Sequence, residues 1–219
     1  MSKSPSRGRS LTSAQVVSML MVFVLLSSAG GVLTAGFAMP MVGAATAVTN
    51  ASAKLFDELP DDFNVLEPSQ ISTIKAADGT QIAQFYAENR IVVPLDEVAP
   101  IMQNAIVAVE DQRFYQHKGV DPTGIIRAVV SNANGGSQGA STLTQQYVRN
   151  VLVEAAIQKD DTAAQSAATA RSAARKIREI KYALTLEQRY SKQQILEGYL
   201  NIAAFGPSTY GVEASARHY

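Results

Sequence analysis

The stretch "AIVAVEDQRFYQHKGVD", residues 105–121, is the most informative segment for predicting the fold of this chain. It begins as an apolar run and then places two acids, two cations and one of the chain's two histidines within positions 110–118. Only 17% of the 219 residues are charged, so this concentration is unusual. It indicates either a solvated helix face or a site, and the local pattern alone does not separate the two readings.

The spacing within this stretch indicates that one of its acids could be catalytic. If residues 105–117 form a helix, Glu110, Phe114 and His117 share a face, because they lie four and three residues apart. An acid beside an aromatic ring is partly desolvated, which makes it a better proton acceptor. Glu110 is therefore a candidate general base. The preceding residues also predict a helix that begins near Ile101. Its apolar residues at helical spacing are Ile101, Ala105, Ala108 and Val109.

The residues before the helix divide into four segments. Residues 1–15 form a basic tail, and residues 16–40 are an apolar run long enough to cross a membrane, with the N-terminus on the cytoplasmic side. A cleaved signal peptide is the alternative, although the run is long for one. Residues 41–68 are a polar, acidic linker. Residues 69–95 are a small β element, because two alternating segments flank Asp78-Gly79, a hairpin turn signal.

The residues after the stretch predict further helices. Asp121-Pro122 is an N-cap followed by a first-turn proline, and this helix runs to about Asn132. Thr142 and Gln145 match a capping box, and Ser191 caps the segment "KQQILEGYLNIAA". Between them, residues 154–174 are alanine-rich and read as an exposed helical hairpin or a flexible insertion, followed by the amphipathic "RKIREIKYALTLEQRY". The pattern is that of a mainly α domain.

A glycine-rich loop leads into the helix that starts near Thr142. Its glycines let backbone amides approach a ligand, and a helix N-terminus favours anions. Hydrogen-bonding side chains crowd the next positions, and Arg149 follows one turn later. This is typical of an oligosaccharide or phosphate cradle, and the alternative is a flexible loop before a well-capped helix. The polar candidates are Ser141, Thr142, Thr144, Gln145 and Gln146.

The segment "RKIRE", residues 175–179, is a third constellation. Arg175 and Glu179 are four residues apart, and Lys176 lies three residues before Glu179. Such a run is usually a solvated, salt-bridged face. The functional reading is a cation cluster for a pyrophosphate, in which Glu179 orients the cations or holds a divalent metal ion.

Composition excludes several classes of function. The chain has no cysteine, which rules out disulfides, thiol catalysis and cysteine-ligated zinc. The formal net charge is zero, so nothing points to a nucleic-acid partner. "STIK", residues 72–75, fits the S-x-x-K pattern of penicillin-reactive serine enzymes, but it lies in an alternating strand and no K-T-G accompanies it.

Taken in order, the motifs resemble those of the family 51 peptidoglycan glycosyltransferases, found in class A penicillin-binding proteins and in monofunctional transglycosylases. The similar segments are "EDQRFYQHKGVD", "GASTLTQQ", "RKIRE", "KQQILEGYLN" and "YGVEASARHY". The resemblance implies a lysozyme-like domain over residues 96–219, on the outer face of the cytoplasmic membrane. It also implies a single-pass anchor, with lipid II and a nascent glycan strand as substrates and other cell-wall synthesis proteins as partners.

The resemblance also implies roles for individual residues. Glu110 is the general base, and Arg149 and Arg175 neutralise the departing undecaprenyl pyrophosphate. Glu179 is a second essential acid that supports the pyrophosphate or its Mg²⁺ or Mn²⁺ ion. The remaining candidates line the substrate groove, and they are Phe114, His117, Ser141, Thr142, Thr144, Gln145, Gln146 and Lys176.

This sequence departs from the family pattern in three places. Arg149 stands where the family commonly has lysine, which keeps the charge but replaces a point donor by a planar fork. Residues 154–174 lengthen the gap between the second and third motifs. The chain ends inside the fifth motif, so we expect an incomplete domain. Two alternative functions remain open: a lytic or hydrolytic lysozyme-like enzyme, and an inactive membrane-anchored scaffold.

Overall fold

The computed structural model describes residues 12, 15–24, 27, 49–51, 53–54, 56–59 and 63–219. The chain divides into two units, residues 1–53 and 54–219, and each is described by itself. In the first unit residues 15–24 are helical, and most of the predicted anchor at 16–40 lies outside the described residues. Within the described part of the chain, none of the helices combines the length and apolar character that crossing a membrane requires.

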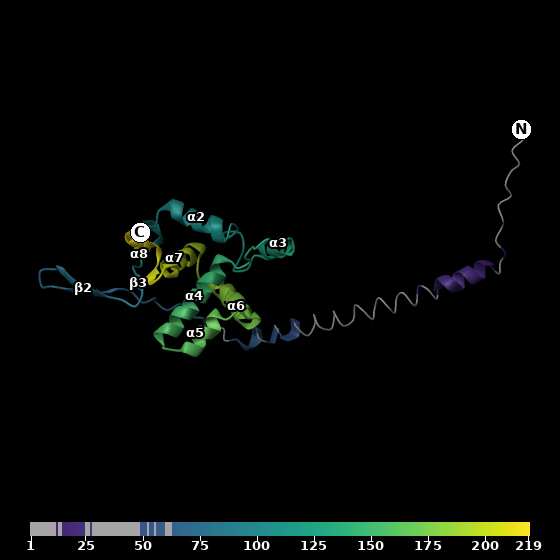
Figure 1. Ribbon diagram of the computed structural model, residues 1–219, viewed down its shortest axis with the longest axis horizontal. Helices are drawn as coiled ribbons and strands as arrows, with labels where there is room; N and C mark the ends of the chain where they lie inside the picture. Colours follow the sequence, from purple (N-terminus) through teal and green to yellow (C-terminus); the bar gives the residue numbers. More distant parts are fainter. Residues whose placement is uncertain are drawn as a thin grey trace, which may run out of the picture. The chain divides into compact units, whose positions relative to one another are not determined.

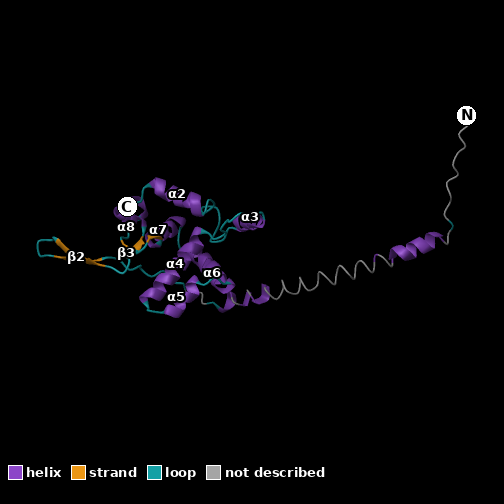
Figure 2. Cartoon of the chain, viewed as in Figure 1, coloured by secondary structure: helices purple, strands orange, loops and turns teal. Residues whose placement is uncertain are grey.

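The second unit is built mainly of helices, as the sequence predicts (Figures 1 and 2). Its longest helices are the central α4, which packs against both α6 and α7, and α6 itself. The helices are η1 (Leu95–Glu97), α2 (Pro100–Glu110), α3 (Pro122–Ala133), α4 (Leu143–Gln158), α5 (Thr162–Thr169), α6 (Ala173–Arg189), α7 (Lys192–Ile202) and α8 (Val212–His218).

Helix starts follow the predicted caps. The hydroxyl of Thr142 accepts the Gln145 N–H at the start of α4, at 3.2 Å. Ser191 and Gln194 form a complete capping box at the start of α7. The alanine-rich segment is helical, with the end of α4 and α5 packed together, which agrees with the helical-hairpin reading.

The small β element is present and extends further than predicted. Strands β1 (Ser72–Lys75) and β2 (Gln81–Phe85) form the antiparallel hairpin around Gly79, whose φ of 88° lies in the left-handed region that glycine tolerates. The short β3 (Asn89–Arg90) pairs in parallel with β5 (Thr209–Tyr210), which in turn pairs with β4 (Ala204–Gly206). The region before the helices is therefore tied to the last part of the chain.

A buried ion pair fixes β3 against α4. Arg90, which is 1% exposed, lies 3.3 Å from Glu154 and 2.7 Å from Glu88. Burial raises the pKa of Glu154, but the Ser69 N–H, the side chain of Gln158 and the charge of Arg90 outweigh burial and hold that pKa at about 2. Burial raises the pKa of Glu88, the second carboxyl at the same arginine.

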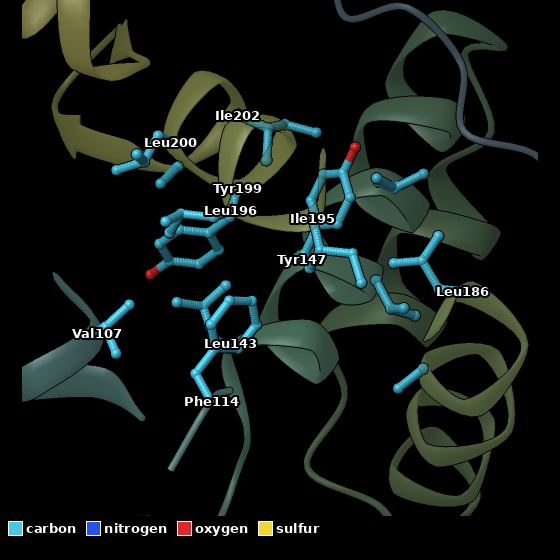
Figure 3. Packing of buried hydrophobic residues seen from close by; sticks show 14 of the residues in the cluster. Val107, Phe114, Leu143, Tyr147, Leu186, Ile195, Leu196, Tyr199, Leu200 and Ile202 are labelled. Carbon is cyan, nitrogen blue, oxygen red and sulfur yellow. The ribbon is translucent and has the colours of Figure 1, made fainter. Parts of the chain in front are cut away.

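The hydrophobic core lies between α4, α6 and α7, with one turn of α2 added (Figure 3). Burying a side chain such as leucine or isoleucine contributes about 1.5–3 kcal/mol, so these contacts hold the helices that carry the site. Fully buried members include Phe114, Leu143, Val148, Ile195, Leu196 and Leu200.

Helix α2 is correctly predicted, but its buried side differs from the predicted stripe. Ile101 and Val109 are each 79% exposed, whereas Ile106 and Val107 pack toward the core. The chain also leaves the helix at Glu110 rather than continuing to His117, because Asp111 takes an extended φ of −157°. The prediction that Glu110, Phe114 and His117 share one helical face is therefore wrong.

Candidate active site

Glu110 is exposed at the last position of α2. Its Oε2 accepts a hydrogen bond of 2.8 Å from Nε2 of Gln146, in the first turns of α4. The Tyr199 hydroxyl of α7 donates to Oε1 of the same amide at 3.3 Å. Glu110 also lines a small pocket with Ser141 and Arg127. The candidate base is thus accessible to a ligand and is held by a polar contact.

The neighbouring motif residues stabilise the turn after α2. Asp111 is buried, and its Oδ2 lies 2.9 Å from Nε2 of His117 and accepts the Leu143 N–H at 2.9 Å. Phe114 is 0% exposed and packs in the core. Phe114 and His117 are both buried, so the part in the substrate groove predicted for each stays a prediction. The contacts of Asp111 also explain why the helix stops at Glu110.

The polar residues at the start of α4 divide by burial. Thr142 and Thr144 are buried: Thr142 donates to the carbonyl of Gly119 at 2.8 Å, and Thr144 donates to Glu187 at 2.6 Å. Gln145, 1% exposed, donates to the same Gly119 carbonyl at 2.9 Å. These residues hold the helix start in place. Ser141 and Gln146 are half-buried and remain candidates for direct substrate contact.

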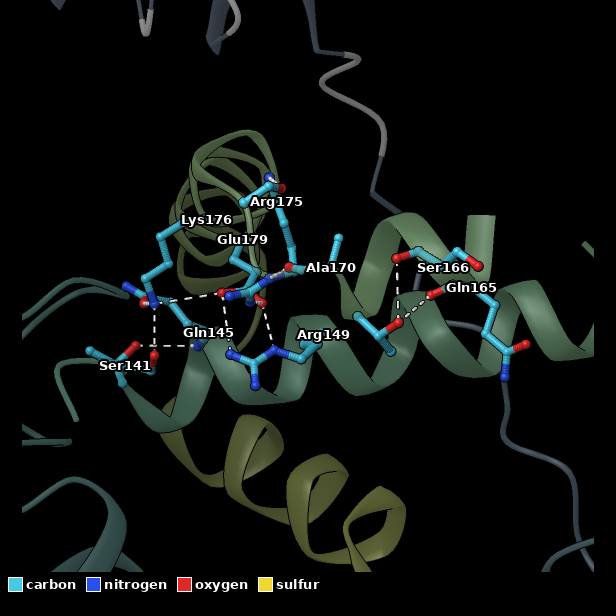
Figure 4. A network of polar contacts seen from close by, with 12 residues as sticks. Ser141, Gln145, Arg149, Gln165, Ser166, Ala170, Arg175, Lys176 and Glu179 are labelled. Atoms are coloured by element: carbon cyan, nitrogen blue, oxygen red, sulfur yellow. Dashed lines mark hydrogen bonds and ion pairs between the residues drawn. The ribbon is translucent and has the colours of Figure 1, made fainter. Parts of the chain in front are cut away.

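A cluster of three cations surrounds one buried carboxylate (Figure 4). Glu179 of α6 is 0% exposed. Its oxygens contact Nε of Arg149 at 2.6 Å, Nη1 of Arg175 in a short contact, and Nζ of Lys176 at 3.5 Å. Three positive charges against one negative charge leave the cluster with a net charge of +2, so it attracts an anion.

Lys176 links this cation cluster to the glycine-rich loop. Its Nζ donates to Oγ of Ser141 at 2.7 Å and to Oε1 of Gln145 at 2.6 Å. Burial, together with the positive charges of Arg149 and Arg175, lowers the pKa of Lys176, although Glu179 acts in the opposite direction. The glycine-rich loop and the cation cluster are therefore directly connected through Lys176.

The arrangement does not fit a metal ion bound directly by Glu179. Both carboxylate oxygens already contact cations, and a divalent ion there would meet three positive charges at close range. Among the described residues, no group of three or more histidines and acids has a geometry that could hold a metal. A Mg²⁺ or Mn²⁺ ion therefore does not fit as an ion bound directly by the Glu179 carboxylate.

Two consecutive glutamines join the acid to the cations. Gln146 donates to Glu110, while Gln145 accepts from Lys176, so one turn of α4 links a candidate base to an anion site. Tyr199 was not among the candidates from sequence, although it belongs to the motif "KQQILEGYLN". Tyr199 is connected to Glu110 only by its hydrogen bond to Gln146, which lies on another helix, so no local spacing in the sequence indicates this connection.

Comparison with known proteins gives the family of this chain. The model of the transglycosylase family matches residues 78–219, so the matched region begins inside the small β element. The chain is 41% identical to penicillin-binding protein 1A of Escherichia coli over 74% of this chain. It is 35% identical to penicillin-binding protein 1A/1B of Bacillus subtilis over 84%, and 37% identical to penicillin-binding protein 1A of Mycobacterium tuberculosis over 78%.

The chain belongs to the transglycosylase family. The aligned parts span 18%, 18% and 20% of the three relatives, which are therefore much longer than the region they share with this chain.

Proposed function

We propose that this chain carries a peptidoglycan glycosyltransferase domain that joins lipid II to a growing lipid-linked glycan strand. The observation that supports it best is the link through Gln145 and Gln146. These neighbours on α4 contact an exposed acid of α2, Glu110, and a member of the cation cluster on α6, Lys176. Glycosyl transfer from a pyrophosphate needs these two parts: a base for the attacking hydroxyl and positive charge for the leaving group.

In the proposed reaction Glu110 is the general base. Its carboxylate takes the proton from the 4-hydroxyl of the acceptor sugar while that oxygen attacks the anomeric carbon of the donor. The bond from this carbon to the pyrophosphate oxygen breaks, and the anomeric configuration inverts. A positioned base contributes about 10²–10⁴-fold to such a step. The exposed position of Glu110 beside a pocket suits this role.

The leaving group in this proposal is undecaprenyl pyrophosphate, stabilised by the cation cluster. Arg149 and Lys176 each have about a third of their side-chain surface exposed, so they remain accessible to a phosphate while held by Glu179. Charge-assisted hydrogen bonds from such groups to phosphate oxygens are strong. In this view Glu179 orients the cations, and the planar fork of Arg149 offers two donors to the pyrophosphate.

The surface of α2 and α3 supports a location next to a membrane. Ile126, Val129 and Val130 of α3 are 66%, 63% and 56% exposed, in addition to Ile101 and Val109 of α2. The three residues of α3 are spaced i, i+3 and i+4 and so share one helix face, and an exposed apolar face is typical of a surface that contacts another apolar phase. We propose that the domain lies on the outer face of the cytoplasmic membrane, anchored through residues 16–40 with the N-terminus inside.

A lytic or hydrolytic enzyme is less well supported by this geometry. An inverting hydrolase uses a second carboxyl group that activates water. Asp111 and Glu179 are buried and occupied by partners, and hydrolysis has no need of a cluster with net positive charge. The cation cluster therefore favours transfer from a pyrophosphate-linked donor.

The test is to incubate the full chain in lipid vesicles with labelled lipid II and to measure the length of the products. A transferase lengthens glycan strands, a hydrolase shortens strands supplied to it, and a scaffold does neither. Arg149→Ala should weaken the use of the donor more than that of the acceptor. Equal loss for both substrates would count against the proposed role of the cation cluster.

A further inference from the structure

We infer that Gln146 and Tyr199 are positioning residues that hold the Glu110 carboxylate in the orientation in which it accepts a proton. This inference rests on the proposed function, because it assigns the surroundings of the same base. Neither residue takes part in bond making here: Gln146 acts on Glu110, and Tyr199 acts through Gln146.

Donor and acceptor chemistry fixes the direction of this relay. An ionised carboxylate only accepts hydrogen bonds, so the amide of Gln146 must direct its nitrogen toward Glu110. The amide oxygen is then left for a donor, and the Tyr199 hydroxyl supplies one at 3.3 Å. If the amide flipped, its oxygen would face the carboxylate, and the two acceptors would repel each other. The carboxylate therefore selects this amide orientation, and the Tyr199 hydroxyl stabilises it by donating to the amide oxygen.

Tyr199 is well suited to act as a fixed donor. Its residue is 6% exposed and its ring lies in the core cluster on α7, so packing sets the place of the hydroxyl (Figure 3). Burial and the negative charge of Glu110 raise the pKa of Tyr199 to about 12. The phenol therefore stays protonated across the working pH range and keeps donating to Gln146.

The two other acids of this pocket, Asp111 and Asp121, lie against other partners. Asp111 pairs with His117, and Asp121 lies 3.4 Å from Arg113. Arg127 of α3 lines the same pocket as Glu110. In the part of the chain that the structure describes, no ion pair holds the Glu110 carboxylate, so the amide of Gln146 is its polar anchor.

The test is the pH profile of glycan polymerisation by the full chain in vesicles, for Tyr199→Phe and Gln146→Leu. We expect kcat to fall about threefold to tenfold with little change in KM, because a hydrogen bond to an exposed charged group is lost or misdirected. The acidic limb should move to higher pH, because a carboxylate that loses a donor is protonated more readily.

Tyr147→Phe is the matched control. Tyr147 is 7% exposed and burial raises its pKa to about 12, as in Tyr199, but its hydroxyl lies against Gly198, away from Glu110. It should leave kcat and the acidic limb unchanged. A purely structural effect of removing a buried hydroxyl would appear in both variants and would not move the limb.

The outcomes separate this inference from the proposed function. If Glu110→Gln is inactive but the acidic limb is unmoved in both Tyr199→Phe and Gln146→Leu, the positioning role is wrong and the base assignment stands. If Glu110→Gln polymerises at the wild-type rate, the base assignment fails and the inference fails with it. Gln146 is half-buried, so its variant gives the same reading if Tyr199→Phe does not fold.

Discussion

Removing the charge of Glu179 should destabilise the domain strongly. Breaking a buried ion pair by removing one partner costs about 3–5 kcal/mol, because the other charge is left without compensation. Glu179→Gln leaves three cations around a neutral amide. The Arg149 and Lys176 side chains are 34% and 33% exposed and can turn toward water, whereas Arg175 is only 17% exposed. We therefore expect a loss near the lower end, about 3 kcal/mol.

Thermal and denaturant unfolding measure this loss. For a domain of this size about 3 kcal/mol lowers Tm by roughly 6–12 °C. Glu213→Gln is the control, because Glu213 forms an i,i+4 pair with Arg217 whose side chain is 67% exposed, and such pairs contribute about 0.3–0.5 kcal/mol. If Glu179→Gln were no more destabilising than Glu213→Gln, the stability of the cation cluster would not depend on the buried carboxylate of Glu179, contrary to this prediction.

Two further predictions concern the scaffold of the site. Gly119→Ala should lower the free energy of unfolding by about 1–3 kcal/mol more than Gly135→Ala, as measured by denaturant unfolding. Both glycines have positive φ, but an added Cβ would meet a backbone atom only at Gly119, where the Ala183 carbonyl oxygen lies at 2.8 Å. Equal losses in the two variants would contradict this. The folded-state pKa of Glu154 lies below its ordinary value of 4.5, so its contribution is present above pH 4.5 and is lost as pH falls toward about 2. Glu154→Gln should remove about 3 kcal/mol of this pH-dependent loss, and an unchanged slope between pH 4.5 and 2 would show that Glu154 is not responsible.

The helices that start at strong local signals were predictable from sequence. Thr142 and Ser191 accept backbone N–H groups three residues on, and such caps are set by neighbours in the chain. The end of α2 was not predictable in this way. Asp111 leaves the helix because it accepts the N–H of Leu143, 32 residues away, and pairs with His117. Local periodicity contains no information on that contact.

The same distinction applies to the β strands. The hairpin of β1 and β2 follows from alternation around a turn, whereas β3 and β5 have two residues each and no readable period. They pair through Asn89 and Thr209, which are far apart in sequence. The side of α2 that is buried also depends on tertiary packing, which places the stripe of Ile101 and Val109 outward.

For the site, the sequence motifs singled out candidate residues but did not distinguish buried from exposed ones. In the structure Phe114 and Thr144 are fully buried, while Glu110 is exposed. Gln146 was expected in the substrate groove and is found bonded to Glu110. Tyr199 was missed because its contact with Gln146 crosses between α7 and α4. Contacts with residues of other helices decide the role of a residue, and the sequence does not show these contacts.

The most direct test of the account is the rate at which Glu110→Gln polymerises labelled lipid II. The substitution keeps the size of an exposed side chain, so an unchanged Tm should accompany it. The account predicts a fall of about 10²–10⁴-fold in polymerisation, with lipid II still bound through the cation cluster. Polymerisation at the wild-type rate by the folded variant would contradict the assignment of Glu110 as the general base.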